Sequence, residues 1–325
     1  MSPPLLQVRN LTTRFNSERG RLTAVDQVSF DVGAGETVAI VGESGSGKSV
    51  TALSIMRLIP SPPGRIEAGE VLFEGKDLLK LDDAGIRAIR GNRMAMIFQE
   101  PMSSLNPTLT VGLQVAEPVN LHRGSPWAKA YDSARELLGR VRIPDAASRL
   151  ASFPHQYSGG MRQRVMIAMA LACQPRLIIA DEPTTALDVT VQAQILDLIK
   201  ELTRETGSSL LLITHDLGVV ARYADRVAVM YGGRIVETAP ASALYRAPRH
   251  PYTLGLMASV PRLDGDVGRR LVPIEGQPPD LAELPPGCAF SPRCRIATEP
   301  CRIARPPFTE CEPQHWKACF NDARV

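Results

Sequence analysis

Eight consecutive residues, Gly42 to Ser49, have the composition and spacing of a loop that binds a polyphosphate. Their sequence, GESGSGKS, fits the pattern G-x-x-x-x-G-K-[ST]. Glycines let backbone N–H groups turn toward phosphate oxygens, and the N-terminus of a following helix adds positive partial charge. In such a loop Lys48 reaches the terminal phosphates and the Ser49 hydroxyl binds Mg²⁺. The predicted phosphate-binding residues are Gly42, Ser44, Gly45, Ser46, Gly47, Lys48, Ser49 and Val50.

Two adjacent carboxylates, Asp181 and Glu182, follow the apolar run Leu177–Ala180. A buried strand that ends in acids is where enzymes with such a loop place a metal-coordinating aspartate, so we predict that Asp181 binds Mg²⁺. Glu182 is predicted to act as the base or to position the attacking water. For an isolated Asp-Glu pair a solvated turn is the better interpretation, but the phosphate-binding loop upstream favours the catalytic one.

These residues must be positioned by alternating strands and helices. Short apolar runs typical of buried parallel strands occur at 37–41, 177–180, 210–213 and 226–230. Helical patterns follow two of them, at 49–58 and 191–203, and residues 102–172 form a mainly helical insert. The alternation predicts an α/β fold, an open parallel sheet with helices on both faces. Because Gly42 lies between a strand and a helix, an ordinary Gly/Ser turn is the weaker alternative.

The overall composition is that of a folded chain outside the lipid bilayer. With 325 residues, 44% hydrophobic and 22% charged, the chain is long enough for one large domain or two smaller ones. Its apolar runs are far shorter than the about 20 residues of a membrane-spanning helix. Residues Met1–Gln7 lack the features of a secretory signal, so we expect a cytoplasmic location. The net charge of +3 is too small to indicate binding to nucleic acid or anionic lipid.

The octapeptide YSGGMRQR at Tyr157–Arg164 resembles the signature motif of ATP-binding cassette (ABC) ATPases. Gln99, Asp188 and His215 complete, in the family's order, the elements that accompany this motif. The resemblance covers about residues 5–245, and on it the chain is identified as a member of the ABC family. It implies a P-loop NTPase with a RecA-like parallel core, an antiparallel β subdomain and the helical insert. It also implies ATP, bound with Mg²⁺, as the ligand.

The resemblance implies roles for single residues outside the loop. Phe15 resembles the aromatic residue that stacks on adenine, and Gln99 resembles the residue that contacts Mg²⁺ or the attacking water. His215 resembles the switch histidine on the γ-phosphate, and Asp188 resembles a residue that communicates between two sites. Without the resemblance, Phe15 would be interpreted as a core residue and Gln99 as a solvated side chain. His215 would be interpreted as a structural histidine.

Ser158 and the N–H groups of Gly159 and Gly160 begin a predicted helix and so form a second anion site. In the family this site closes on the nucleotide of a partner cassette, which implies a dimer with a second copy or a sister subunit. Met161 replaces the glutamine that is commonest at its position in the family, while the Ser and Gly contacts are retained.

Several stretches are similar to ATPase subunits of bacterial peptide and nickel importers. They are residues 42–49, 180–194, 214–220, 250–253, 276–281 and 284–294. This resemblance spans essentially the whole chain and implies an ABC nucleotide-binding domain at 1–255, with its helical subdomain at about 102–172, followed by an extension at 256–325.

The branch implies an ATPase that drives solute import at the cytoplasmic face of the cell membrane. Its implied partners are a second ABC ATPase subunit, two transmembrane permease subunits and, through the complex, an extracytoplasmic substrate-binding protein, with no nucleic acid. Peptides are the favoured cargo, with nickel or another small solute as alternatives. The rival interpretation is a non-transport ABC ATPase that acts on nucleic acid or the ribosome, but the sequence carries one phosphate-binding loop and no basic arm.

Five of the six cysteines lie in the last 38 residues. Thiols clustered in a reducing compartment indicate a metal before a disulfide. Four of them match the four-cysteine pattern of the branch: Cys288, Cys294, Cys301 and Cys319. A [4Fe-4S] cluster is favoured over zinc, because the spacings lack the C-x-x-C pairs of common zinc modules and some members of the branch carry a cluster. Unligated thiols are the third alternative; Cys311 is additional, and Cys173 is predicted to be an inert core thiol.

Overall fold

The computed structural model describes residues 3–17, 20–185, 187–259 and 273–321. Contacts between residues divide the chain into two units. The first consists of residues 1–5, 32–36 and 80–212, and the second of residues 6–31, 37–79 and 213–325. The boundary at residue 255 remains a prediction, and of the extension beyond it residues 260–272 and 322–325 lie outside the described residues.

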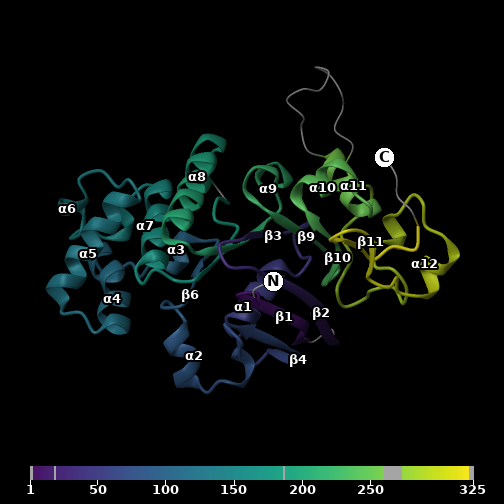
Figure 1. Ribbon diagram of the computed structural model, residues 1–325, viewed down its shortest axis with the longest axis horizontal. Helices are drawn as coiled ribbons and strands as arrows, with labels where there is room; N and C mark the ends of the chain where they lie inside the picture. The colour runs from purple at the N-terminus through teal and green to yellow at the C-terminus, as the bar shows by residue number, and fades with distance from the viewer. Residues whose placement is uncertain (1–2, 18–19, 186, 260–272, 322–325) are drawn as a thin grey trace. The chain divides into compact units, whose positions relative to one another are not determined.

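The first unit is mainly helical (Figure 1). Its helices are α2 (Asp83–Ile89), α3 (Pro101–Ser104), α4 (Val111–Arg123), α5 (Trp127–Arg140), α6 (Ala146–Arg149), α7 (Gly159–Leu171) and α8 (Val189–Thr206), with a 3₁₀ turn, η2, at Pro154–Gln156. In α5 the buried residues Ala130, Ala134, Leu137 and Leu138 recur at the spacing of one helix face. Gly124, with φ of 61°, ends α4 in the left-handed conformation that favours glycine. Helices α3 to α7 occupy the region predicted to be the helical insert.

Three strands of the first unit lie in the order β8–β7–β6. They are β6 (Met94–Ile97), β7 (Leu177–Asp181) and β8 (Ser209–Thr214), the last of which continues into the second unit. Strands β6 and β7 are parallel, with Met94 opposite Leu177 and Ile97 opposite Ala180. Every residue of β7 is buried, which explains why its sequence is a continuous apolar run.

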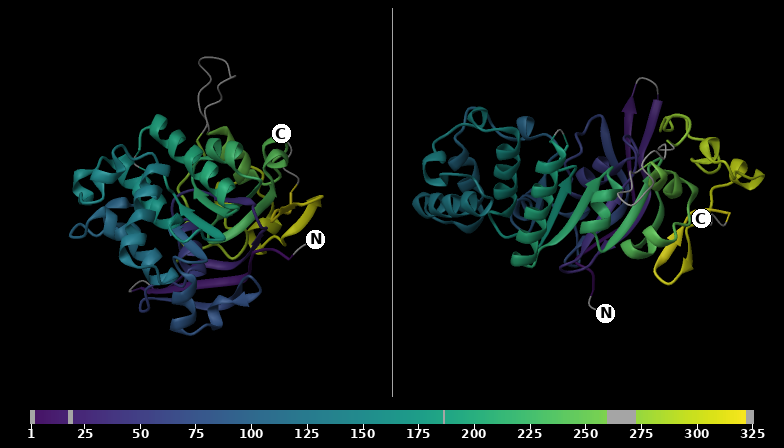
Figure 2. Two further views of the ribbon diagram at one scale, coloured as in Figure 1. Left: turned by 60° about the vertical axis from the view of Figure 1, so that its left-hand side comes forward. Right: turned by 90° about the horizontal axis from the view of Figure 1, so that it is seen from above.

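In the second unit, strands lie in the order β11–β12–β10–β9–β3. These are β3 (Thr37–Val41), β9 (Arg226–Tyr231), β10 (Arg234–Pro240), β11 (Thr309–Glu312) and β12 (His315–Lys317). Strands β3 and β9 are parallel, and the other pairs are antiparallel. Figure 2 shows the yellow C-terminal hairpin of β11 and β12 beside the green strands. The C-terminal part of the chain therefore extends this sheet.

The helices of the second unit are short. They are α1 (Lys48–Ile55), α9 (Leu217–Tyr223), α10 (Ala241–Arg246), α11 (Pro251–Ala258) and α12 (Glu299–Ile303), with 3₁₀ turns η1 (Leu78–Lys80, which ends in the first unit) and η3 (Ser291–Arg293). Within the described part of the chain, no helix is long and apolar enough to cross a membrane.

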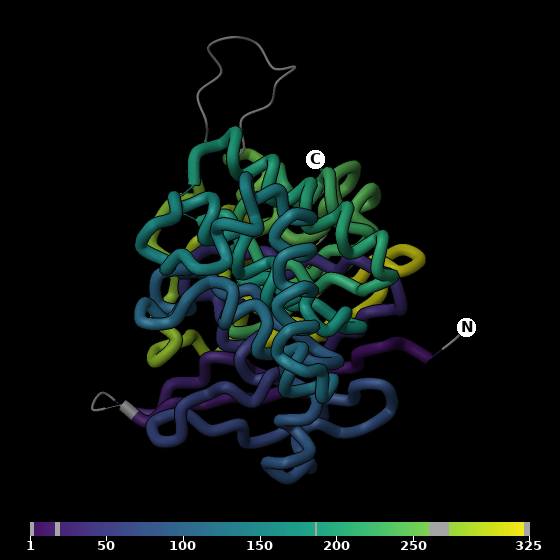
Figure 3. Tube along the Cα trace, turned by 90° about the vertical axis from the view of Figure 1, so that its left-hand side faces the viewer, coloured from purple at the N-terminus to yellow at the C-terminus, as the bar shows by residue number. Residues whose placement is uncertain are grey.

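A second sheet of this unit is antiparallel and has the order β2–β1–β4–β5. Its strands are β1 (Leu6–Ser17), β2 (Gly20–Val32), β4 (Gly64–Phe73) and β5 (Lys76–Asp77). Figure 3 shows its purple and blue strands running alongside one another. Strands β1 and β4 pair from Leu6 opposite Phe73 to Phe15 opposite Gly64. This sheet corresponds to the antiparallel β subdomain that the resemblance implied.

Candidate functional site

The loop predicted to bind phosphate joins β3 to α1. Two of its glycines are required by close backbone packing. A Cβ atom on Gly42 would lie 2.2 Å from the carbonyl oxygen of Met230, and one on Gly47 would lie 2.3 Å from that of Ala24. Gly47 also has φ of 102°, a conformation that side chains other than glycine rarely adopt. The loop therefore lies directly against the neighbouring backbone.

The lysine of this loop is held inside it. Lys48 is 4% exposed, and its ammonium donates hydrogen bonds to the carbonyl oxygens of Gly42 (2.8 Å) and Glu43 (3.0 Å). The buried hydroxyl of Ser46 has no hydrogen-bond partner among the described residues. A buried hydroxyl without a partner costs free energy, and a phosphate oxygen is an acceptor that fits it.

The carboxylates lie at the end of β7 in the first unit. Asp181 is the last residue of the strand and is 5% exposed. Glu182 has φ of 44°, so the chain turns sharply after Asp181. One oxygen of Glu182, Oε2, accepts hydrogen bonds from Nε2 of Gln99 at 3.1 Å and from the hydroxyl of Thr185 at 3.0 Å. The structure thus brings together two residues predicted separately, Gln99 and Glu182.

The signature segment forms the start of α7. Ser158 is the N-cap residue, and its hydroxyl accepts a hydrogen bond from the backbone N–H of Met161 at 3.3 Å. Ser158 and Gly159 are exposed. A Cβ atom on Gly160 would lie 3.1 Å from Val191 of α8, so glycine keeps the two helices close at this point. The cap engages the N–H of Met161, and the N–H groups of Gly159 and Gly160 in the first turn have no acceptor within the helix.

Three further predicted residues lie in different elements. Phe15 is half-buried on β1, opposite Gly64 of β4. His215 follows β8 and is exposed. Asp188 caps α8, because its carboxylate accepts the N–H of Val191 at 2.9 Å. Val50, predicted with the loop, lies in the first turn of α1. The loop, Phe15 and His215 belong to the second unit, and the other predicted nucleotide residues belong to the first.

Two family profiles match the chain. Residues 25–185 match the family described as ABC transporter, and residues 236–301 match the C-terminal region of oligopeptide/dipeptide transporters. A putative peptide import ATP-binding protein of Brucella melitensis is 53% identical over 329 residues, which cover 98% of this chain and 97% of the relative. The chain belongs to the ABC transporter family. The family predicted from the signature motif is therefore confirmed, and with it an ATPase.

Other ABC relatives match over nearly the same length. The oligopeptide transport ATP-binding protein OppD of Haemophilus influenzae is 50% identical, and the match covers 98% of both chains. The dipeptide transport ATP-binding protein DppD of Bacillus subtilis is 52% identical, with 97% of this chain and 94% of the relative covered.

Solved ABC structures share the fold. A dimeric, post-hydrolysis cassette, MJ0796 with bound ADP and Pi, has a TM-score of 0.65 at 30% identity and covers 73% of this chain and 98% of its own. The cbiO1 protein of Clostridium perfringens has a TM-score of 0.62 at 27% identity, over 75% of this chain and 91% of its own. These matches confirm the predicted cassette fold.

Four thiols of the extension influence one another electrostatically. The pKa of Cys288 is raised to about 11, mainly by burial, with a smaller contribution from the neighbouring thiols of Cys319, Cys301 and Cys294. Burial likewise raises the pKa of Cys294 and of Cys319, to which the other thiols again contribute. However, no group of three or more His, Cys, Asp or Glu side chains in the described ranges is arranged to hold a metal ion. The geometry therefore does not support the predicted iron–sulfur site directly.

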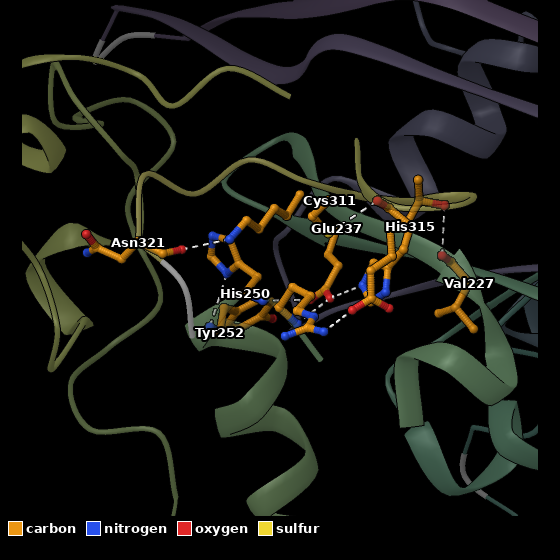
Figure 4. Close-up of polar contacts among 11 residues, drawn as sticks. Val227, Glu237, His250, Tyr252, Cys311, His315 and Asn321 are labelled. Atoms are coloured by element: carbon orange, nitrogen blue, oxygen red, sulfur yellow. Dashed lines mark hydrogen bonds and ion pairs between the residues drawn. The ribbon is translucent and has the colours of Figure 1, made fainter. Parts of the chain in front are cut away.

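The remaining cysteines differ from these four. The thiol of Cys311 donates a hydrogen bond to the carbonyl oxygen of His315 at 3.2 Å (Figure 4). Cys173 is buried, burial raises its pKa, and its thiol donates to the carbonyl oxygen of Pro118 at 3.3 Å. A buried thiol with a raised pKa is a poor nucleophile.

Sequence reasoning missed contacts that the structure supplies. Thr185 was not singled out, although it follows Glu182 closely in the sequence. The sequence indicates Arg293 only as part of the extension, yet this residue forms an ion pair with Glu43 of the loop. The two residues are 250 positions apart, so no local pattern could have indicated this pair.

Proposed function

We propose that the chain is the ATP-hydrolysing subunit of a bacterial ABC importer for oligopeptides or dipeptides. The observation that carries this proposal is the similarity to peptide import ATP-binding proteins over 98% of the chain, extension included. The match of residues 236–301 to the C-terminal region of oligopeptide/dipeptide transporters points to the same branch.

The proposed ATP site uses the loop and the acids in the roles predicted for them. Lys48 and the N–H groups of the loop bind the phosphates. The buried hydroxyl of Ser46, which has no partner within the described part of the chain, supports this role. Mg²⁺, when bound, neutralises phosphate charge, and Ser49, Asp181 and Gln99 are the residues that would hold it. Glu182 polarises the attacking water, and Gln99 and Thr185 fix the direction of its carboxylate.

Three residues complete the proposed site from outside the loop and the acids. Phe15 stacks on the adenine, His215 donates to the γ-phosphate and Asp188 links the site to that of a partner. The exposed side chain of His215 supports the role given to it.

We further propose that the chain works as one of two cassettes. Ser158, Gly159 and Gly160 would bind the nucleotide held by the partner cassette, and the exposed position of Ser158 and Gly159 at the start of α7 supports this. The dimeric state of the similar cassette MJ0796 agrees with it. Two permeases would anchor the pair at the cytoplasmic face of the membrane and receive cargo from a substrate-binding protein.

The four thiols of Cys288, Cys294, Cys301 and Cys319 are proposed to hold a [4Fe-4S] cluster, which would cross-link the extension when bound. The support for this proposal is that thiols of this set contribute to raising the pKa values of Cys288, Cys294 and Cys319. A four-iron cluster is wider than a single ion, so its ligands stand further apart than those of zinc. Cys311 is engaged elsewhere.

The import proposal is tested on the chain purified in detergent with its permeases and incorporated into vesicles. We expect ATP hydrolysis to rise when a peptide-loaded substrate-binding protein is added, and to be lost in a complex that contains Lys48→Ala. Stimulation by a nickel-loaded binding protein alone would replace peptide with nickel as the cargo. Stimulation of the chain by RNA, without co-purification of permeases, would overturn the import function.

A further inference from the structure

An arginine of the C-terminal extension forms an ion pair with the phosphate-binding loop. The guanidinium of Arg293 donates to both carboxylate oxygens of Glu43, with Nη1 to Oε2 at 2.6 Å and Nη2 to Oε1 at 3.0 Å. The side chain of Arg293 is 5% exposed and that of Glu43 is 25% exposed. Paired, charge-assisted hydrogen bonds of this kind fix both distance and orientation, and they are stronger when shielded from water.

The backbone N–H and carbonyl groups of Glu43, like its carboxylate, form hydrogen bonds. Its backbone N–H donates to the hydroxyl of Tyr252 at 2.8 Å, and Tyr252 lies on α11. Its carbonyl oxygen accepts from Nζ of Lys48 at 3.0 Å and from the N–H of Ser46 at 3.2 Å. A displacement of Glu43 would therefore move an acceptor of the lysine that is expected to bind phosphate.

Arg293 is itself held rigidly. Its Nε donates to the carbonyl oxygen of Glu275 at 3.0 Å, and Nη1 lies 3.4 Å from the hydroxyl of Tyr231. The guanidinium carbon lies 5.9 Å from the ring centre of Tyr231 and 6.0 Å from that of Phe290. Phe290 in turn packs with Tyr252 at a ring-centre distance of 5.4 Å. One aromatic cluster thus supports both contacts to Glu43.

We propose that Arg293 and Tyr252 are positioning residues of the ATPase: they hold Glu43, and with it the phosphate-binding loop, in the geometry that binds ATP. The proposal rests on the phosphate-binding role proposed above for this loop. Because Arg293 lies in the extension and immediately precedes Cys294, ATP affinity depends on the folded state of the cysteine-bearing segment. The extension is thereby part of the machinery of nucleotide binding.

The test compares full-length variants in which one partner or both are changed. Arg293→Met removes the charge and keeps much of the side-chain volume, Glu43→Gln removes the opposite charge, and the third variant combines the two. The matched control is Arg295→Met, because Arg295 pairs with Glu275 in the same segment but both side chains are largely exposed, at 69% and 74%. KM for ATP, kcat, affinity for a fluorescent Mg-ATP analogue and thermal melting are measured for each.

We expect Arg293→Met to raise KM about tenfold, the effect of one lost charge-assisted hydrogen-bond pair, with kcat changed less than about twofold. Arg293→Lys should restore only part of the affinity, since lysine cannot bind a carboxylate through two nitrogens. The double variant should be no weaker than Arg293→Met, because the two changes remove one interaction. Arg295→Met should behave as the unchanged chain.

An unchanged KM in Arg293→Met, or effects of the two single changes that add in full, overturns the proposal. If Arg293→Met does not fold, Glu43→Gln decides, because it is nearly isosteric: it should raise KM severalfold, and an unchanged KM refutes the positioning role. The Lys48→Ala variant distinguishes failure of the phosphate-binding role of the loop from failure of the positioning role of Arg293. If Lys48→Ala leaves nucleotide affinity intact, the loop assignment itself fails; if it abolishes binding while Arg293 variants bind normally, only the positioning role fails.

Discussion

At the scale of single residues, Glu182 has a strained backbone and two hydrogen-bond donors on one carboxylate oxygen. A φ of 44° is uncommon for a residue other than glycine, and such conformations persist where the surrounding structure holds them. Gln99 and Thr185 supply that support through Oε2. In the role proposed for Glu182, this arrangement would orient the base in advance of the reaction.

We predict that Glu182→Gln lowers kcat at least about 100-fold, because the amide cannot accept a proton from water. Affinity for ATP should stay the same, since the amide preserves the side-chain shape. Steady-state hydrolysis and nucleotide binding measure the two effects. Thr185→Val, which removes a single donor, should lower kcat only severalfold, and normal hydrolysis by Glu182→Gln would rule out this base.

A second residue-scale prediction concerns His250. This histidine is buried and caps α11, with Nδ1 accepting the N–H of Tyr252 at 3.1 Å. Its pKa is lowered from 6.5 to about 4, mainly by burial, with Glu237 opposing the shift and Lys317 adding to it. Between these pH values the unfolded chain binds a proton that the folded chain does not, so stability falls as the pH decreases.

At pH 5 this linkage costs about 2 kcal/mol relative to neutral pH. We expect His250→Asn, which retains a capping acceptor but does not titrate, to lose that much less stability between pH 7.5 and pH 5. Urea unfolding at the two pH values measures it. Equal losses in both proteins would show that His250 does not carry the pH dependence.

At the scale of elements, helix caps coincide with predicted functional residues. Asp188 caps α8, and Ser158 caps α7. Asp188→Ala should destabilise the protein by about 1 kcal/mol, whereas Asp188→Asn should not, because asparagine is an equally good cap. Urea unfolding checks this. A loss of ATPase activity in Asp188→Asn, with stability kept, would separate a catalytic role from the cap, and equal stability of all three proteins would contradict the capping role.

The sequence was informative where function depends on neighbouring residues. The loop at Gly42–Ser49 and the strand that ends at Asp181 could be predicted, because strand, loop and helix follow one another directly in the chain. The contact between Gln99 and Glu182 joins two parallel strands and became visible only in the fold. The pair of Arg293 and Glu43 depends on packing across 250 residues, which local patterns do not encode.

At the scale of the whole molecule, the cysteines of the extension yield a further prediction. Protein purified without oxygen should contain iron and sulfide in the amounts that correspond to one cluster per chain. It should also show the broad visible absorbance of thiolate-bound iron. The Cys301→Ser variant should lose the iron, and its ATP affinity should fall because Arg293 lies in the same segment. The Cys311→Ser and Cys173→Ser variants should retain the iron. Bound zinc, or iron content insensitive to Cys301→Ser, would contradict the cluster.

Within the second unit, the C-terminal strands are linked to β10 through a buried acid. Glu237 on β10 is fully buried and accepts the N–H groups of Arg249 (2.6 Å) and His250 (3.0 Å), while Nε2 of His315 lies 2.6 Å from it. Figure 4 shows Glu237 together with His250 and His315. The same strand pairs with β12, with Glu237 opposite Lys317.

This pairing has a consequence for the chain as it is synthesised. Strand β10 ends at Pro240 and β11 begins only at Thr309, about 70 residues later. Until the hairpin of β11 and β12 arrives, β10 presents an unpaired edge on which another strand could add, whereas in the finished unit the outer strand is β11, with Glu310 and Glu312 along it. At ordinary rates of translation, synthesis of these residues takes roughly 4 to 14 seconds, and an unpaired strand edge is prone to aggregation during that interval.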